Sequence, residues 1–311
     1  MPGEMASLDP PTVPEPSGTV LRRIVDWYSA HARDLPWRGS HASSWSILVS
    51  EVMLQQTPVV RVLPVFESWM SRWPTLTELA DSSSGDAVRE WGRLGYPRRA
   101  LRLHAAAKAC VEHHAGQVPD TVTELRALPG VGEYTAAAVA VFAFRQRHAV
   151  LDTNVRRVYA RVFNGSKFER PGAPTVAEKV RALAILPEDH EAAATASVSV
   201  MELGALCCSA KTPDCGVCPV SDLCAWLLAG RPDWQGPARR GQTYTGTDRQ
   251  CRGRLLSVMR RTDGAVTHTE LSAAWSDDEQ RQRALTGLIV DGLIQPEQST
   301  SDGSRLYSLP R

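Results

Sequence analysis

The stretch ALPGVGEYTAAAVAVFAF, residues 127–144, decides how the rest of the chain is interpreted. Two glycines, Gly130 and Gly132, flank Val131 directly before an alanine-rich run that predicts a helix. Glycines at such a place let backbone N–H groups turn outward at a helix N-terminus, a geometry that holds a phosphate without a cationic side chain. An ordinary corner between two helices explains the pair of glycines about equally well. The preceding Leu128 and the helix that follows favour a helix-hairpin-helix that contacts a DNA backbone.

The segments around this hairpin predict a mostly helical protein. From about residue 20 to residue 228, apolar residues recur three and four apart, and short breakers such as LPWRGS and ERPGAP separate the runs. A Pro- and Gly-rich linker follows at residues 229–248. Residues 249–311 then read as a helix, a short helix, a helix and a hairpin, which predicts a small winged-helix-like α+β domain.

Bulk composition excludes several classes of protein. The chain has 311 residues, 43% of them hydrophobic, but no apolar run long enough to span a membrane. The Pro-rich residues 1–18 lack the apolar core of a signal peptide and predict a disordered tail. Seven cysteines without a secretion signal favour an intracellular chain. A net charge of +1 requires any nucleic-acid surface to be a local patch.

Four cysteines near residue 220 have the pattern of a metal centre. Their order is Cys208-x6-Cys215-x2-Cys218-x5-Cys224. This spacing differs from the two CxxC halves of many zinc sites and suits a [4Fe–4S] cluster, although a structural zinc or inert thiols remain alternatives. Cys207 competes with its neighbour as a ligand, and the x6 spacing favours Cys208. The loop between the first two ligands carries Lys211, which is expected to contact DNA.

Two carboxylates stand out against their surroundings. Glu51 lies within SSWSILVSEVMLQQTP, residues 43–58, which otherwise reads as a buried apolar helix. A buried carboxylate is costly unless it is paired or used. Asp152 directly precedes a helix in AVLDTNVRRVYARVF, where an Asp most often caps the helix.

Six ordered motifs together carry a resemblance to a known family: LPWR, SEVMLQQT, LGYPRRALRLH, LPGVGEYT, LDTNV and MELGALCC. The chain resembles the helix-hairpin-helix DNA glycosylase superfamily, and within it the adenine DNA glycosylase (MutY) family, over about residues 20–228. The resemblance implies an all-α, two-domain fold. A six-helix barrel of residues 46–149 would be inserted into a [4Fe–4S] cluster domain of residues 19–45 and 150–228, with DNA lying across both.

The resemblance also implies a reaction in base excision repair. Adenine opposite 8-oxoguanine or G in double-stranded DNA would be flipped out of the duplex and released by hydrolysis of its glycosidic bond. Glu51, with a pKa raised by its apolar setting, would protonate the leaving base, and an ionised Asp152 would stabilise the oxocarbenium-like sugar. Tyr134 and Asn154 would orient these groups, so the four residues form the predicted catalytic set.

Further residues are expected to contact the base or the DNA. Gln56 and Thr57 would brace the vacated stack, Tyr96 would insert beside the pair, and Trp37 and Arg38 would line the adenine pocket. For Trp37, core packing is an equal alternative. The full predicted set is Trp37, Arg38, Leu54, Gln55, Gln56, Thr57, Tyr96, Leu128, Gly130, Val131, Gly132 and Lys211.

Tyr134 bears on the rival interpretations. Endonuclease III uses a lysine after its hairpin to cut the backbone, and this chain has Tyr134 there. We therefore predict a glycosylase without strong lyase activity at abasic sites. Another superfamily glycosylase, endonuclease III-like or acting on thymine mismatches, is the first alternative. A non-catalytic DNA-binding protein is the second, and it leaves Glu51 unexplained.

The chain also departs from the family. Typical members carry a larger Nudix-related domain that reads 8-oxoguanine, whereas here only residues 225–311 follow the last cluster cysteine. Pro97 and Val198 replace residue types common in the family. The tail's arginines are expected either to contact phosphates or to form a solvated surface; they are Arg239, Arg240, Arg249, Arg252 and Arg254. The resemblance further predicts a monomeric, cytoplasmic, nucleoid-associated bacterial enzyme.

Overall fold

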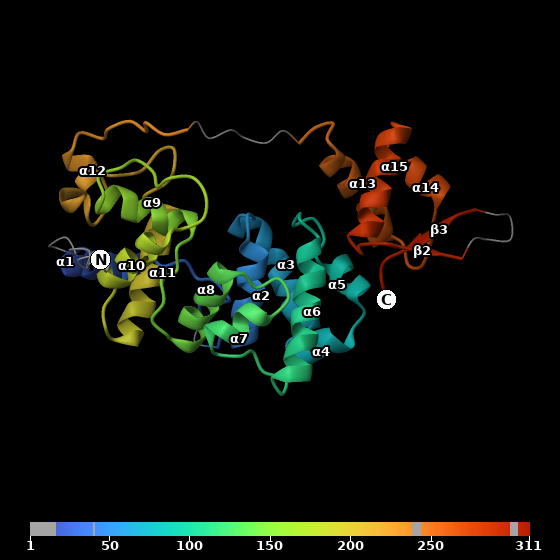
Figure 1. Cartoon of the computed structure of the whole chain (residues 1–311), viewed down its shortest axis with the longest axis horizontal. Helices are drawn as coiled ribbons and strands as arrows, with labels where there is room; N and C mark the ends of the chain where they lie inside the picture. The colour runs from blue at the N-terminus through green and yellow to red at the C-terminus, as the bar shows by residue number, and fades with distance from the viewer. Residues whose placement is uncertain (1–16, 40, 238–243, 299–303) are drawn as a thin grey trace, which may run out of the picture. The chain divides into compact units, whose positions relative to one another are not determined.

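The computed structural model describes residues 17–39, 41–237, 244–298 and 304–311 (Figure 1). These residues divide into two compact units. Unit 1 holds residues up to Gly39 and Ala137–Ala238, and unit 2 holds Ser40–Ala136 and Arg239–Arg311. The predicted disordered tail lies outside the described residues except for its last two, with which the first helix begins.

Unit 1 is built from helices around one apolar core. They are α1 (Ser17–His31), the second part of α8 (Glu133–Phe144), α9 (Thr153–Val162), α10 (Val176–Ile185), α11 (His190–Leu206), η1 (Ser221–Leu223) and α12 (Ala225–Leu228). Helix α11 packs against both α1 and α9. Ile24, Val158 and Leu203 are fully buried in this core, and Cys208 and Cys224 belong to it as well.

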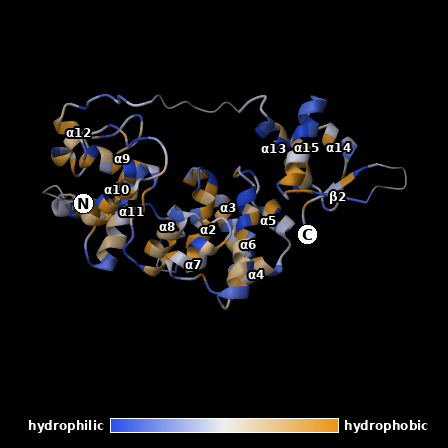
Figure 2. Ribbon diagram, viewed as in Figure 1, coloured by the Kyte–Doolittle hydropathy of each residue, from blue (hydrophilic) through white to orange (hydrophobic). Residues whose placement is uncertain are grey.

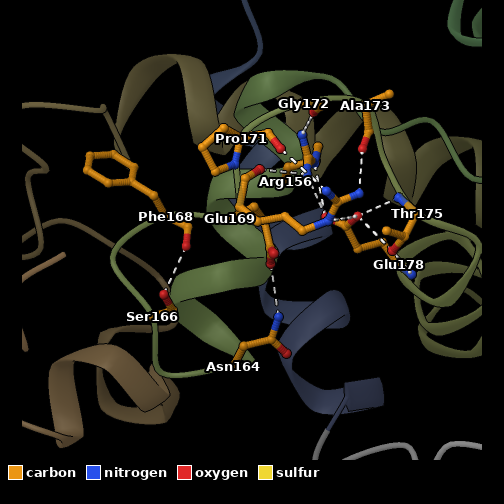
Figure 3. A network of polar contacts seen from close by, with 11 residues as sticks. Arg156, Asn164, Ser166, Phe168, Glu169, Pro171, Gly172, Ala173, Thr175 and Glu178 are labelled. Atoms are coloured by element: carbon orange, nitrogen blue, oxygen red, sulfur yellow. Dashed lines mark hydrogen bonds and ion pairs between the residues drawn. The ribbon is translucent and has the colours of Figure 1, made fainter. Parts of the chain in front are cut away.

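The connection between α9 and α10 is organised by one arginine (Figure 3). Arg156 of α9 forms a 2.6 Å ion pair with Glu178 of α10 and donates to the carbonyls of Gly172 and Arg170. Glu178 also completes a capping box with Thr175 at the start of α10. The Arg156 side chain therefore binds groups of unit 1 itself.

Unit 2 contains the helices that lie between residues 44 and 136. They are α2 (Ser44–Leu54), α3 (Val59–Arg72), α4 (Leu76–Asp81), α5 (Ser84–Glu90), α6 (Arg98–His113), α7 (Val122–Ala127) and the start of α8. The indole rings of Trp73 and Trp91 pack edge-on against that of Trp69, and Trp69 and Trp91 are fully buried. Such pairs fill much core volume with few side chains.

The C-terminal residues of unit 2 form a small α+β fold. Its elements are α13 (Asp248–Arg261), β1 (Val266–Thr267), α14 (His268–Ser272), α15 (Asp278–Val290), β2 (Gln295–Glu297) and β3 (Leu306–Ser308). The three strands are antiparallel in the order β1-β3-β2, with Tyr307 opposite both Val266 and Pro296. The mostly helical, winged-helix-like prediction is confirmed; the two-residue strand β1 is an addition to it.

The domain limits predicted from the motifs stay a prediction. The compact units change over within α8, after Ala136, and not at residue 149, and they place the C-terminal residues with the barrel helices. Figure 2 shows hydrophobic residues concentrated in the helices, whereas residues 229–237, at the start of the predicted linker, are mostly hydrophilic. Among the described residues, no helix has the length and apolar character needed to cross a membrane.

Candidate DNA-binding and catalytic site

Glu51 lies on the apolar helix α2, one turn before its end. Ser43 caps this helix by accepting a hydrogen bond from the Ser46 N–H at 3.1 Å. Glu51 is 7% exposed, and its neighbours Val49 and Val52 are buried as well. The structure therefore places a carboxylate inside an apolar helix, as the sequence indicates.

The turn after α2 presents one of its polar residues to solvent and buries another. Gln56 is exposed and has a left-handed φ of 56°, and Gln55 donates to the Thr135 hydroxyl at 3.1 Å, while Leu54 is half-buried. Thr57 is 5% exposed, and its hydroxyl accepts a 2.9 Å hydrogen bond from Arg99. Gln56 thus has the exposure that a bracing residue needs, whereas the Thr57 side chain supports the turn.

Arg99, on α6, ties this turn to the turn that carries Tyr96. Its guanidinium donates to the carbonyls of Val52, Met53 and Gln55 at 2.7–2.9 Å, and to that of Gly95 at 3.0 Å. The first three lie at the C-terminal end of α2, where a cation is favoured. Burial lowers the pKa of Arg99 to about 10, so the group stays charged at neutral pH.

The Tyr96 turn joins α5 to α6 in a strained conformation. Tyr96 is 46% exposed, and its φ of 46° is unusual for a bulky residue. The adjacent Gly95 also has a positive φ, 84°. The Arg99 guanidinium lies 5.6 Å from the centroid of the Tyr96 ring. The structure thus holds an aromatic ring at the surface beside the Gln56 turn, through Arg99.

The hairpin before α8 needs a glycine at its first position. Gly130 has a φ of 81°, and a Cβ there would lie 2.6 Å from the Cβ of Arg102. The Val131 N–H donates to the Leu128 carbonyl at 3.1 Å, so this donor serves the turn and does not point outward. Gly132 lies in an open and exposed position, and Tyr134, on the first turn of α8, is half-buried.

Asp152, in unit 1, caps helix α9. Its carboxylate accepts the Val155 N–H at 2.6 Å and the Asn154 amide at 2.8 Å. Burial raises the pKa of Asp152 above its ordinary value, while these hydrogen bonds lower it, and the net change is upward. The helix-cap interpretation is therefore confirmed, and the expected stabilisation of the ionised form is opposed by burial.

Asn154 connects Asp152 to the cysteine segment. Its amide oxygen accepts from Arg157 at 2.8 Å, and Arg157 also donates to the carbonyls of Gly204 and Cys208 at 2.6 and 2.7 Å. A Cβ at Gly204 would lie 2.8 Å from the Cβ of Asn154. A side chain larger than glycine at residue 204 would therefore displace Asn154.

The LPWR residues are anchored within unit 1 by a buried ion pair. Glu202, on α11, is fully buried. It accepts two hydrogen bonds from the Arg33 guanidinium, each of 2.7 Å, and forms an ion pair with Arg38 at 2.8 Å. Burial would raise the pKa of Glu202, but the two guanidinium groups hold it at about 2. Trp37 is 7% exposed. Arg38 is thus an internal anchor, whatever it contributes to a base pocket.

The predicted cluster cysteines lie around one small pocket. Cys208, Cys215, Cys218 and Cys224 all line it, and so does Cys207. Four thiolates are the ligand set of a [4Fe–4S] cluster, and the Arg161 guanidinium lies 3.3 Å from the Cys208 sulfur, where it balances negative charge. In the described part of the chain, no three His, Cys, Asp or Glu side chains are arranged for a single metal ion. The residues fit the cluster.

The loop between the first two cluster ligands is held by hydrogen bonds from Arg161. Arg161 is 1% exposed and donates to the carbonyls of Ser209 and Ala210 at 2.8 and 3.2 Å. Lys211, at the tip of this loop, is exposed. Cys207 donates to the Asp214 carbonyl at 3.0 Å, so its thiol has a structural role beside the ligands.

Sequence reasoning missed the buried charges that support these features. Arg99, Arg157 and Glu202 are at most 7% exposed, and most of their partners are backbone groups or residues distant in sequence. For Arg99 a signal exists, because residues 99, 100, 103, 104, 106, 107 and 110 form the buried stripe of α6. A cation on such a stripe indicates a specific buried partner.

Comparison with known proteins identifies relatives of this arrangement. Residues 49–182 match the family described as HhH-GPD superfamily base excision DNA repair protein, and residues 208–224 match the iron–sulfur binding domain of endonuclease III. The chain is 53% identical to an adenine DNA glycosylase of Mycobacterium tuberculosis, covering 97% of this chain and 98% of the relative. It is 39% identical to the human adenine DNA glycosylase, covering 65% of this chain and 38% of that protein.

Solved structures resemble the fold as well. A thermostable thymine-DNA glycosylase matches with a TM-score of 0.62 and 25% identity, covering 68% of this chain and 97% of the other. A trapped endonuclease III–DNA covalent intermediate matches with a TM-score of 0.57 and 21% identity, covering 69% and 97%. The match to the endonuclease III iron–sulfur domain begins at Cys208 and ends at Cys224, which supports the predicted ligand set.

Proposed function

This chain belongs to the adenine DNA glycosylases of the helix-hairpin-helix base excision repair superfamily, and we propose that it removes adenine paired with 8-oxoguanine or G in double-stranded DNA. The single observation that carries the proposal is Glu51, a carboxylate buried in an apolar helix directly before the exposed Gln56 turn. A buried carboxylate is costly unless it is paired or used.

The proposed task of Glu51 is to protonate the leaving base. Adenine leaves poorly as an anion, and protonation of a ring nitrogen lowers the barrier to breaking the glycosidic bond. An apolar environment disfavours an ionised carboxylate and so supplies a proton donor near neutral pH. After departure of the base, the same carboxylate would accept a proton from the attacking water.

The proposed task of Asp152 is to stabilise the positively charged sugar. The Val155 N–H and the Asn154 amide, which bond its carboxylate directly, are neutral, and the charge of the nearby Arg157 lowers the pKa of Asp152 less than these contacts do. The ionised carboxylate can stabilise an oxocarbenium-like state or bond transiently to the anomeric carbon. The proposal requires both carboxylates to reach one extruded nucleotide, with Tyr134 and Asn154 orienting them.

Extrusion of the base leaves a gap that side chains must fill. We propose that Gln56 and Tyr96 do so, because both are exposed on turns that Arg99 holds together. Unstacking a base costs a few kcal/mol. The two left-handed backbone positions keep these turns protruding.

The proposed enzyme leaves an abasic site without cutting the strand. Tyr134 follows the hairpin, and the four lysines lie at other positions: Lys108, Lys167, Lys179 and Lys211. Schiff-base chemistry needs an amine at the sugar. Borohydride trapping on DNA with an abasic site should therefore give little covalent product, and strong capture would contradict this proposal.

A single-turnover assay tests the whole proposal. We expect release of adenine opposite 8-oxoguanine and G, little release opposite C, and no release of thymine opposite G. Glu51→Gln should bind the same duplex and release no adenine. Release of thymine instead would favour the alternative activity. That alternative has support from 34% identity with a thymine-DNA glycosylase of Aeropyrum pernix over 66% of this chain.

A further inference from the structure

The C-terminal α+β fold is attached to the barrel helices by a reciprocal pair of arginines. Arg89 of α5 donates to the carbonyls of Arg260 and Thr262, at the end of α13, at 2.6 and 3.0 Å. Arg260 of α13 donates to the carbonyls of Val88 at 2.8 Å and of Gly92, at the end of α5. Each helix thus has its C-terminal carbonyls satisfied by a cation from the other.

The attachment extends to the last residues of the chain. A Cβ at Gly85 of α5 would lie 2.2 Å from the Pro310 carbonyl oxygen and 3.0 Å from the Cβ of Leu309. Burial lowers the pKa of Arg260 to about 10, so the arginine remains charged at neutral pH within this interface. Such close backbone approach and buried charge are typical of a fixed contact and not of a loosely tethered tail.

This attachment surrounds the Tyr96 turn, residues 92–98. At one end of the turn, the Gly92 carbonyl accepts from Arg260. At the other end, Arg98 forms a 3.3 Å ion pair with Asp291, the residue after α15, and Asp291 also pairs with Arg252 of α13. In the middle, the guanidinium of Arg249 lies 5.7 Å from the centroid of the Tyr96 ring.

The Tyr96 ring therefore contacts two guanidinium groups from separate elements. Arg99 comes from α6 and Arg249 from the first turn of α13. The ring is half exposed on a strained backbone, so its direction depends on such neighbours. Arg249 is exposed and adds positive charge beside the ring, and Arg254 is exposed five residues further along the same helix.

We infer that the C-terminal fold is a brace for the Tyr96 turn, with Arg249 as the positioning residue that directs the ring toward double-stranded DNA. Helix α13 then extends the DNA-contacting surface beside Tyr96, where its arginines meet backbone phosphates. The inference rests on the proposed role of Tyr96 in filling the gap left by the extruded base. It assigns the residues after the linker to base extrusion.

The test compares Arg249→Ala with Arg254→Ala in the full-length protein. Both remove one exposed charge from α13, but only the first removes a contact with Tyr96. Extrusion is followed by fluorescence of 2-aminopurine beside an adenine opposite 8-oxoguanine, and adenine release by single-turnover kinetics. A cation–π contact at an exposed site predicts that Arg249→Ala slows extrusion about two- to fivefold, while Arg249→Lys restores it.

The Tyr96→Ala background makes the test specific. There, Arg249→Ala should cause no further slowing of extrusion, whereas the salt-dependent loss of DNA affinity from Arg254→Ala should persist unchanged. Equal effects of the two arginine variants, or an undiminished effect of Arg249→Ala without Tyr96, would overturn the brace. Melting temperatures identify any variant that acts by unfolding.

Failure of the proposed function gives a different result. If the wild-type protein extrudes a base but releases thymine and not adenine, the proposed substrate fails. If Tyr96→Ala leaves extrusion unchanged, the proposed role of Tyr96 fails. In the first case the comparison of the arginine variants still decides whether α13 braces the turn. In the second case the brace fails together with the role of Tyr96.

Discussion

Asp152 is half-buried and Glu202 is fully buried in unit 1, and the surroundings of these two carboxylates differ. Glu202 is bonded by the guanidinium of Arg33 and paired with that of Arg38, and these groups hold its pKa at about 2. The carboxylate of Asp152 accepts from a backbone N–H and an amide, and burial raises its pKa. Glu202, bonded directly by cations, serves the fold, whereas Asp152, bonded by neutral donors with Arg157 only nearby, keeps a charge that a substrate can use.

The largest expected effect is on activity, from Asp152→Asn. Asn caps a helix about as well as Asp, so the N-terminus of α9 should survive and the melting temperature should change little. Loss of the negative charge should slow adenine release by about 10³-fold, the scale of removing one preorganised electrostatic partner. Single-turnover kinetics measure the rate of adenine release, and thermal denaturation measures the melting temperature. A variant that unfolds while its remaining folded fraction keeps full activity would reverse the assignment of Asp152.

Glu202→Gln should show the opposite pattern. The change leaves Arg38 largely buried and Arg33 partly buried beside a neutral amide, and breaking such a pair costs about 3 kcal/mol of the free energy of unfolding. Denaturant titration measures this loss. The folded fraction should still release adenine, since Glu202 is not proposed to touch the substrate. A large drop in rate at full stability would instead place Glu202 in the chemistry.

The pH dependence of stability tests the assignment of Glu202. The pKa of Glu202 is about 2 in the folded chain, and that of an unfolded Glu is about 4.3. Its contribution is therefore fully present above about pH 4.3 and is lost as the pH falls toward 2. The shift is equivalent to about 3 kcal/mol. Wild type should lose more stability than Glu202→Gln over this window in denaturant titrations, and parallel curves would contradict the assignment.

The sequence predicted the features that lie in short motifs. The cysteine spacing indicated the cluster, and the helix–helix–hairpin order of residues 249–311 indicated the winged-helix-like fold. Supporting charges such as Arg260 and Glu202 were missed, because charged residues usually lie at the protein surface. The partners of these two residues also lie far away in sequence. The strand β1 has two residues, too few for an alternating pattern to register.

The Tyr96 turn shows the same limit. Its LGYP motif was visible, but the contact of Tyr96 with Arg249 joins residues 153 positions apart and depends on the packing of α13 against α5. Nothing local to residue 249 distinguishes it from Arg254, five residues further along α13. Motifs thus locate candidate residues, whereas the contacts that position them arise from tertiary packing.

The smallest expected effect comes from Asn154→Ala. The amide of Asn154 donates to Asp152 and lowers its pKa, so its loss favours the protonated carboxyl. If the ionised form of Asp152 is required, the acidic limb of the single-turnover rate should move to higher pH by up to about one unit, the size of one hydrogen bond. The plateau rate at higher pH should fall less than in Asp152→Asn. Asn154→Ser is the matched variant, because a hydroxyl can still donate, and it should shift the limb less. An unmoved acidic limb in both variants would mean that the protonation of Asp152 does not limit the reaction, and it would weaken the contrast with Glu202.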